Sequence, residues 1–336
     1  MFIDVLILEK SARLVRVYGE DPCVTLPETV PAPGGGELSL TELGDYCFSE
    51  HPRNLPGPEK LCRYEVSPEG RCTPVPDRER ELHPVCGSFV EEITLPDSLQ
   101  VVGSCAFYNC RKLRRLSVGA GELTVGSDVF LNCFALADLI IRADPDQGTG
   151  LFALVNNITE AVRALFWLPG EAQPRAGLWY PAYWEDVEES PAHILLHTFS
   201  GQGYHYRQCF LEGKVLSAEY DAIFPDGHAA EDQGVVAMLC FDRLRWPWNL
   251  TEKAGAPYRE FLTGHTGLVL QRLLKEQDTD SVKDLLALDA MDAAAFAEGA
   301  ALAAKADNAA VAALLADAEY QKKASTPKKR RYDFDF

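Results

Sequence analysis

The chain has 336 residues, of which 47% are hydrophobic and 24% are charged. This is the composition of a globular protein, and it excludes a collagen-like or wholly disordered chain. The length predicts two or three domains. With 32 Lys and Arg against 50 Asp and Glu, the net charge is −18, which argues against binding to nucleic acid or to an anionic lipid surface, because both carry negative charge.

The charge is divided unevenly along the chain. Residues 321–336 carry six Lys and Arg and two Asp, so this tail has a net charge of +4 and the body before it −22. We therefore expect partners of the body to be basic or apolar, and we expect the tail to act separately.

The N-terminal sequence MFIDVLILEKSARLVRVYGED starts with apolar residues, but Asp4 and Glu9 interrupt them and no basic leader precedes them. It does not resemble a signal peptide. The apolar runs are short, such as the seven residues 235–241, whereas a membrane-spanning helix needs about 20. These features predict a soluble, cytoplasmic protein with no membrane partner.

Ten cysteines are spread along the chain, and no two of them form a C-x-x-C pair. In a reducing compartment, cysteines without metal-ligand spacing pack as small hydrophobic side chains. We therefore predict structural thiols, no metal site and no cofactor. The ten residues are Cys23, Cys47, Cys62, Cys72, Cys86, Cys105, Cys110, Cys133, Cys209 and Cys240.

Two consecutive segments of the N-terminal half repeat each other at an offset of 23 residues. They read ITLPDSLQVVGSCAFYNCRKLRRLSV, from Ile93, and ELTVGSDVFLNCFALADLII, from Glu122. A period near 23 with Leu at fixed intervals and an Asn-Cys step is typical of a solenoid coil made of a strand, a turn and a return segment. The matching pairs are Val102/Val125, Gly103/Gly126, Phe107/Phe130, Asn109/Asn132, Cys110/Cys133, Leu113/Leu136 and Leu116/Leu139.

At these residues the sequence resembles the BspA-like leucine-rich repeat family of bacteria, whose repeat reads approximately I-x-L-P-x-S-[LV]-x-x-I-G-x-x-A-F-x-N-C-x-x-L. The resemblance spans residues 20–168, is closest over 93–140 and is loose over 20–50. In such a solenoid coil the Asn side chains can bond backbone groups at a tight turn. The neighbouring Cys110 and Cys133 are small enough to fit behind them, which favours a structural role. Members of the family are often surface-displayed adhesive proteins.

Further segments extend or interrupt this repeat. VTLPETV and LTELGDYCFSE form an earlier copy, with the Leu-Pro step and a G-x-x-x-F unit at residues 44–48. An apolar strand at residues 164–168 falls about one repeat after Leu139. Residues 51–88 are rich in Pro, Arg and Glu and predict a solvated insertion without its own core, with a functional loop as the alternative.

The segment from Leu178 onward is rich in aromatic residues. Alternating apolar residues at 193–199 and 204–210, with Gly-Gln-Gly between them, predict a β-hairpin. Aromatic residues beside an acidic run are typical of a protein-binding hot spot, although the core of a small β-layer uses them too. The predicted partner-binding residues are Trp179, Tyr180, Tyr183, Trp184, Tyr204 and Tyr206.

Four residues of this segment raise an enzymatic alternative. His193 and His197 would share one face of a strand, and His205 could approach them across the hairpin to form a three-imidazole metal site. Cys209 with His205 could form a nucleophile and its base. No carboxylate stands at a ligand spacing, no orienting Asn flanks the pair, and no phosphate loop or G-x-S-x-G occurs. We therefore predict no catalytic residue.

The last third predicts helices, starting near Ala229 and broken at Trp246-Pro247-Trp248. From residue 287 to 318, 17 of 32 residues are alanine, which favours helix. A second repeat, at an offset of 29, predicts an αα-hairpin with Asp as its N-cap. It is similar to the helix pair of ankyrin-type repeats, without the T-P-L-H signature or the connecting turn. Its pairs are Leu273/Leu302, Asp278/Asp307, Val282/Val311, Leu285/Leu314 and Leu286/Leu315.

The tail, QKKASTPKKRRYDFDF, has three interpretations. Its basic run resembles a nucleic-acid or nuclear-import patch, which the acidic body argues against. The alternating Asp-Phe-Asp-Phe could add an edge strand to a partner or dock on this protein's own acidic surface. The third interpretation is a solvated terminus.

We therefore predict an α+β protein with four parts. Residues 1–168 form a short leucine-rich repeat β-solenoid with the inserted loop 51–88, residues 169–228 a mixed, β-rich middle segment, residues 229–321 an ankyrin-like α-helical array, and residues 322–336 the basic tail. Repeating coils and helical hairpins build extended surfaces for protein contact. The predicted function is a non-enzymatic, cytoplasmic protein-interaction scaffold. The alternatives are a hydrolase or metal-dependent enzyme using the middle segment, and an adhesin exported by a non-standard route.

Overall fold

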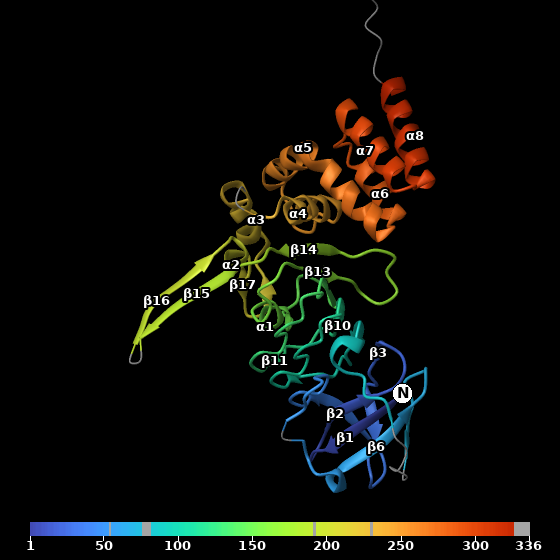
Figure 1. Cartoon of the computed structure of the whole chain (residues 1–336), viewed down its shortest axis with the longest axis vertical. Helices are drawn as coiled ribbons and strands as arrows, with labels where there is room; N and C mark the ends of the chain where they lie inside the picture. Colours follow the sequence, from blue (N-terminus) through green and yellow to red (C-terminus); the bar gives the residue numbers. More distant parts are fainter. Residues whose placement is uncertain (54, 76–81, 191–192, 229–230, 326–336) are drawn as a thin grey trace, which may run out of the picture. The chain divides into compact units, whose positions relative to one another are not determined.

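The computed structural model describes residues 1–53, 55–75, 82–190, 193–228 and 231–325 (Figure 1). The chain divides into two compact units, Met1–Glu231 and Asp232–Phe336. The first unit contains a β-solenoid, and the described part of the second is helical. The fold class is therefore α+β, as predicted.

Parallel strands from successive coils form the first sheet of the solenoid. Val24, Ile93, Leu116, Leu139 and Ala164 lie opposite one another on neighbouring strands and are all buried. The predicted 23-residue repeat thus separates one strand of this sheet from the next. The earlier copy, VTLPETV, and the apolar strand predicted at residues 164–168 also contribute strands to the sheet. Its strands are β3 (Cys23–Thr25), β8 (Glu92–Thr94), β10 (Arg115–Val118), β12 (Asp138–Ile141) and β13 (Val162–Phe166), with β14 (Ala176–Tyr180) antiparallel on β13.

One position before these buried residues, the side chains that lie opposite one another on neighbouring strands alternate in charge. Arg115 lies between Glu92 and Asp138, and Arg163 follows, each opposite the next on neighbouring strands. The Arg163 guanidinium donates from Nε to Oδ1 of Asp138 at 2.8 Å. Cross-strand pairs of opposite charge favour this register over one shifted by a residue.

The second sheet continues from the solenoid into the N-terminal strands. Its parallel strands β2, β5, β9 and β11 are followed by the antiparallel strands β1, β6 and β7. Figure 1 shows β1, β2 and β6 together at one end of the coils. The bounds are β1 (Phe2–Ile7), β2 (Ala12–Tyr18), β4 (Thr29–Pro31, paired with β5), β5 (Glu37–Leu43), β6 (Leu61–Val66), β7 (Cys72–Pro74), β9 (Val101–Val102) and β11 (Thr124–Val125), with short 3₁₀ helices at Pro58–Lys60 and Gly87–Phe89.

The prediction that residues 51–88 form a solvated insertion is wrong for β6, which joins the second sheet. This strand pairs with β1, and its Tyr64 is buried. Arg63 donates from Nε to Oδ1 of Asp4 at 2.8 Å, and the Tyr18 hydroxyl donates to Oδ2 of the same carboxylate at 2.9 Å. The Pro-rich composition concealed a strand whose partner lies about 60 residues earlier in the chain.

The middle segment differs from the predicted hairpin. The antiparallel partner of β16 (His193–Ser200) is β15 (Trp184–Ser190), and residues 203–206 form the helical turn α2 (Gly203–Tyr206). Tyr206 and Arg207 are both buried, and an extended chain would point such neighbours to opposite faces. The remaining elements are α1 (Leu151–Val155), β17 (Phe210–Leu211), β18 (Lys214–Val215) and α3 (Ser217–Gly227).

The middle segment, predicted as mixed and β-rich, ends in the helix α3, which covers residues 217–227. Tyr220 and Phe224 are both buried, and a spacing of four places them on one face of a helix. The Tyr220 hydroxyl accepts from the backbone N–H of Trp179 at 2.9 Å and donates to its C=O at 2.6 Å. The Tyr220 hydroxyl therefore makes the backbone hydrogen bonds that a neighbouring strand would make with Trp179 of β14.

The second unit consists, in its described part, of α4 (Gln233–Arg245), α5 (Glu252–Glu276), α6 (Thr279–Ala287), α7 (Ala293–Lys305) and α8 (Ala309–Ser325). The predicted break at Trp246-Pro247 is confirmed. Asp278 caps α6, as predicted, by accepting from the backbone N–H of Ser281 at 3.0 Å. The predicted cap Asp307 is wrong: it has a φ of 51°, and Asn308 caps α8 instead. Among the described residues, no helix is both long and apolar enough to cross a membrane.

Candidate interaction surface

Successive coils of the solenoid stack phenylalanine on phenylalanine. The ring centroids of Phe48 and Phe107 are 5.5 Å apart, and those of Phe107 and Phe130 are 5.4 Å apart. Behind them, the Sγ atoms of Cys110 and Cys133 donate to the backbone oxygens of Phe48 and Phe107 at 3.4 and 3.1 Å. Burial raises the pKa of Cys133 to about 12. Both cysteines are therefore structural thiols in the repeat, as predicted.

The two asparagines of the repeat differ from the prediction. Asn109 and Asn132 occupy left-handed turns, with φ of 64° and 66°. We expected their side chains to bond the backbone, but Nδ2 of Asn132 donates to Oδ1 of Asn109 at 2.7 Å. The side-chain bond therefore links one coil to the next.

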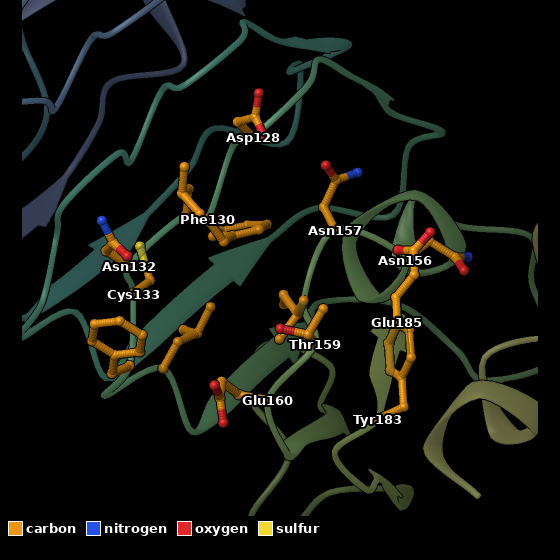
Figure 2. A pocket seen from close by; sticks show the side chains of 14 residues that line it. Asp128, Phe130, Asn132, Cys133, Asn156, Asn157, Thr159, Glu160, Tyr183 and Glu185 are labelled. Carbon is orange, nitrogen blue, oxygen red and sulfur yellow. The ribbon is translucent and has the colours of Figure 1, made fainter. Parts of the chain in front are cut away.

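A hollow of about 300 Å³ lies beside the last coils (Figure 2). The turn at residues 128–136 and the loop at residues 156–160 line it, together with Tyr183 and Glu185. The apolar side chains of Phe130, Leu136 and Ile158 are buried within this lining. Tyr183 is held against the loop, because its backbone N–H donates to the carbonyl oxygen of Thr159 at 3.0 Å.

The rim of the hollow combines exposed apolar side chains with negative charge. Phe134 is 66% exposed and Leu131 is 48% exposed. The described lining residues include Asp128, Glu160 and Glu185 and no Lys, Arg or His. Exposed apolar side chains rimmed by polar ones mark a site of interaction.

The buried Arg207 side chain supports the loop at residues 156–160 and Tyr183, which both line the hollow. Its side chain is completely buried, and its Cζ lies 4.8 Å from the ring centroid of Tyr183. Burial lowers its pKa to about 10, so the guanidinium remains charged at neutral pH. Its nitrogens donate to five backbone oxygens, those of Val155, Ile158, Glu160, Pro181 and Gly203.

Comparison with known families identifies the repeat beside this hollow. Residues 86–162 match the family model described as BspA type Leucine rich repeat region (6 copies). These residues form a BspA type leucine-rich repeat region. The match includes both of the closely similar coils and most of the residues that line the hollow. No curated protein and no solved structure shows a significant match to the chain.

The coils of the BspA type region differ from each other at the hollow. Phe134 and Ala135 occupy the positions that Arg111 and Lys112 occupy one coil earlier, and all four residues are exposed. The sequence prediction used only the positions at which the two coils agree, and it therefore did not identify Phe134. An exposed coil position that changes from a charged residue to phenylalanine is the signal that could have located the hollow.

The six predicted partner-binding residues lie beside the BspA type region in different environments. Tyr183 lines the hollow, and the neighbouring Trp184 is 63% exposed. Tyr204 is half-buried and stacks on Phe199 with ring centroids 4.0 Å apart. Trp179, Tyr180, Tyr183 and Tyr206 are all buried. Buried rings contact no partner unless the fold opens, so the core alternative fits these four. A binding role for the six stays a prediction.

The structure places one residue of the enzymatic alternative differently from the prediction. His205 lies in α2 and not on a strand paired with β16, and the side chains of His193 and His197 lie outside the described part of the chain. Sγ of Cys209 donates to the backbone oxygen of His205 at 3.5 Å. Burial raises the pKa of Cys209 to about 12, which disfavours the thiolate that a nucleophile needs. Among the described residues, no group of three His, Cys, Asp or Glu could hold a metal ion.

Proposed function

We propose that this chain is a non-enzymatic protein-interaction scaffold, and that it binds a partner protein at the hollow beside its BspA type region. Leucine-rich repeats generally mediate protein interactions. The observation that carries the proposal is Phe134, an aromatic ring left 66% exposed on the rim of an acidic hollow. Exposed aromatic anchors with a polar rim are typical of the energetic centres of protein interfaces.

The size of the hollow supports a protein partner. A volume of about 300 Å³ lies at the lower limit for small-molecule sites, but it accommodates a side chain of another protein. The acidic rim adds selectivity, because it favours a partner with positive charge beside its apolar anchor and repels an acidic one. The partner is therefore a protein that presents a basic and apolar segment.

Exchange of matched coil positions tests this function. Phe134→Arg gives the second coil the residue that the first coil carries at position 111, so we expect the thermal melting curve to remain unchanged. Affinity capture from native cells should then yield a protein that binds the wild-type chain and Arg111→Ala but not Phe134→Arg, and the purified pair should reproduce the difference. Equal capture by Phe134→Arg contradicts the proposal.

We also propose a cytoplasmic location. All ten cysteines, each within the described residues, are free thiols, and free thiols are typical of proteins in a reducing compartment. Fractionation of native cells followed by immunoblotting tests this, and surface labelling of intact cells would favour the exported adhesin instead.

A further inference from the structure

We propose that the hollow binds an extended segment of the partner protein in the way that one coil of the repeat binds the next. The inference rests on the proposed function, because it names the kind of segment that the same surface takes. The segment offers backbone carbonyl oxygens at alternate residues to the terminal turn of the repeat, residues 127–133, and an Asn or Gln side chain to Asn132.

Backbone hydrogen bonds join successive turns of the solenoid in one direction. The N–H groups of Tyr46 and Phe48 donate to the carbonyl oxygens of Ser104 and Ala106 at 3.1 and 2.8 Å. In the next step the donors and acceptors are Cys105 to Ser127, Phe107 to Val129 and Asn109 to Leu131, at 2.9, 3.1 and 3.0 Å. Each turn therefore donates, at alternate residues, to the turn that follows it.

The terminal turn keeps these donors but has no acceptors for them among the described residues. Asp128, Phe130 and Asn132 stand 23 residues after the donors of the preceding turn, and their backbone N–H groups donate to no described residue. The backbone conformation is also repeated, because φ is 55° at both Cys105 and Asp128. The three residues line the hollow (Figure 2). Since a backbone N–H is rarely left without a partner or water, the hollow offers three donors to a ligand.

The chain itself does not supply the missing acceptors. One period after residues 128–132 stand residues 151–155, which form α1, and carbonyl oxygens of a helix turn are used locally. The oxygens of Phe152 and Leu154 accept from the backbone N–H groups of Asn156 and Asn157. That of Val155 accepts from Arg207 at 3.0 Å. The helix thus interrupts the ladder of hydrogen bonds at the hollow.

The side chain of Asn132 also has an unused acceptor. Its Nδ2 donates to Oδ1 of Asn109 in the preceding turn, and its own Oδ1 accepts no hydrogen bond from a described residue. An Asn or Gln of the bound segment can donate to this oxygen, which extends the row of amides by one step. This bond favours an amide side chain at one position of the segment.

The rim selects the residues beside that amide. The carboxylates of Asp128 and Glu160 form no ion pair with a described residue, so Lys or Arg in the segment would pair with them. A cation placed over the exposed ring of Phe134 gains a further attraction. A second copy of this chain cannot fill the hollow with its own terminal turn, because the two turns would present N–H groups to each other.

The first coil, supplied as a free peptide, is the probe for this surface. It is a fluorescein-labelled peptide of residues 103–112, GSCAFYNCRK, with Cys105→Ala and Cys110→Ala to prevent oxidation. The peptide carries Asn and two basic residues in the order of the repeat. Fluorescence anisotropy measures its binding to the full-length chain. We expect saturable binding that Asn109→Ala in the peptide weakens about tenfold, the equivalent of about 1.4 kcal/mol, and no saturation with a scrambled peptide.

Hydrogen–deuterium exchange shows whether the open donors are used. Saturating peptide should slow the exchange of the amides at Asp128, Phe130 and Asn132 at least about tenfold, because each gains an acceptor. Mass spectrometry of fragments that cover residues 127–133 measures this. The amides of residues 104–110, which already donate to the terminal turn, should exchange at an unchanged rate. Absence of binding, or binding that leaves exchange at residues 127–133 unchanged, overturns the inference.

Charge variants place the peptide in the hollow. The near-isosteric pair Asp128→Asn with Glu160→Gln should weaken peptide binding about tenfold. The matched control is Glu122→Gln, because Glu122 lines a different hollow of the first unit, and it should leave binding unchanged. Equal affinity for the charge pair and the control would also overturn the inference.

The two proposals fail differently. If Phe134→Arg abolishes capture of a partner protein but the peptide does not slow exchange at residues 127–133, the inference fails and the proposed function stands. If Phe134→Arg leaves capture unchanged and the peptide does not bind, both fail.

Discussion

Nδ2 of Asn132 donates a hydrogen bond to Oδ1 of Asn109, at 2.7 Å, between residues that are equivalent in two successive coils. Both residues have a positive φ, near 65°, a conformation that Asn tolerates better than most residues. The 23-residue repeat therefore places the same side chain, in the same strained backbone, where each copy can bond the next.

Asn132→Ala should destabilise the chain more than Asn132→Gly. Both variants lose a hydrogen bond worth about 1 kcal/mol, but alanine also loses about 1 kcal/mol at a positive φ, where glycine is relaxed. Urea unfolding followed by circular dichroism measures the difference in the free energy of unfolding. Equal destabilisation by the two variants would show that the left-handed turn is not the reason for Asn.

Arg207→Lys should destabilise the first unit by at least about 3 kcal/mol, because a lysine ammonium cannot reach all five backbone oxygens and leaves buried acceptors without a donor. The matched control is Arg13→Lys, in a partly exposed ion pair with Glu42, which should cost less than about 1 kcal/mol. Thermal melting of both variants is the measurement, and similar losses would contradict the role of Arg207 as the support of the loop.

Gly126→Ala should destabilise the solenoid, whereas Gly121→Ala should not. A Cβ at position 126 would lie 2.6 Å from the backbone nitrogen of Ser104, while one at position 121 would find its nearest neighbour at 3.6 Å. Overpacking of this kind costs about 1–3 kcal/mol, and a tolerated surface substitution stays within about 0.5 kcal/mol. Thermal melting of the two single variants measures the difference in stability. An unchanged melting temperature for Gly126→Ala would contradict the close approach of the two coils at this position.

Stability should fall as the pH rises above about 9. Burial raises the pKa of Cys47 and of Cys133 from 9.0 to about 12. Because the folded pKa exceeds the unfolded one, the stability that each thiol contributes is complete below pH 9 and is lost between pH 9 and 12. The slope is up to about 1.4 kcal/mol per pH unit for each group.

Cys133→Ala isolates one of these contributions. Its packing cost does not depend on pH, so the difference in unfolding free energy between wild type and variant should shrink as the pH rises from 9 to 10. Urea unfolding at pH 8, 9 and 10 measures this difference. A constant difference would show that the Cys133 thiol is not protected as its burial implies.

The solenoid was predictable because its signal is local and repeated. Leu116 and Leu139 are 23 residues apart in the sequence and lie opposite each other on β10 and β12, so one period translates directly into one coil. β6 carried no such signal, because Tyr64 pairs with Ile3 across 61 residues. Short alternating runs, as at residues 204–210, suit a strand and a buried helical turn equally well.

The sequence by itself determined the repeat, the helical third, the structural role of Cys110 and Cys133, and the contrast between an acidic body and a basic tail, since each depends on spacing or composition along the chain. The tertiary structure alone decided that Trp179 is buried while Phe134 is exposed, and that Arg207 supports the loop opposite Phe134. Burial and hydrogen-bond partners depend on distant segments brought together by folding, and no local pattern encodes which surface remains open.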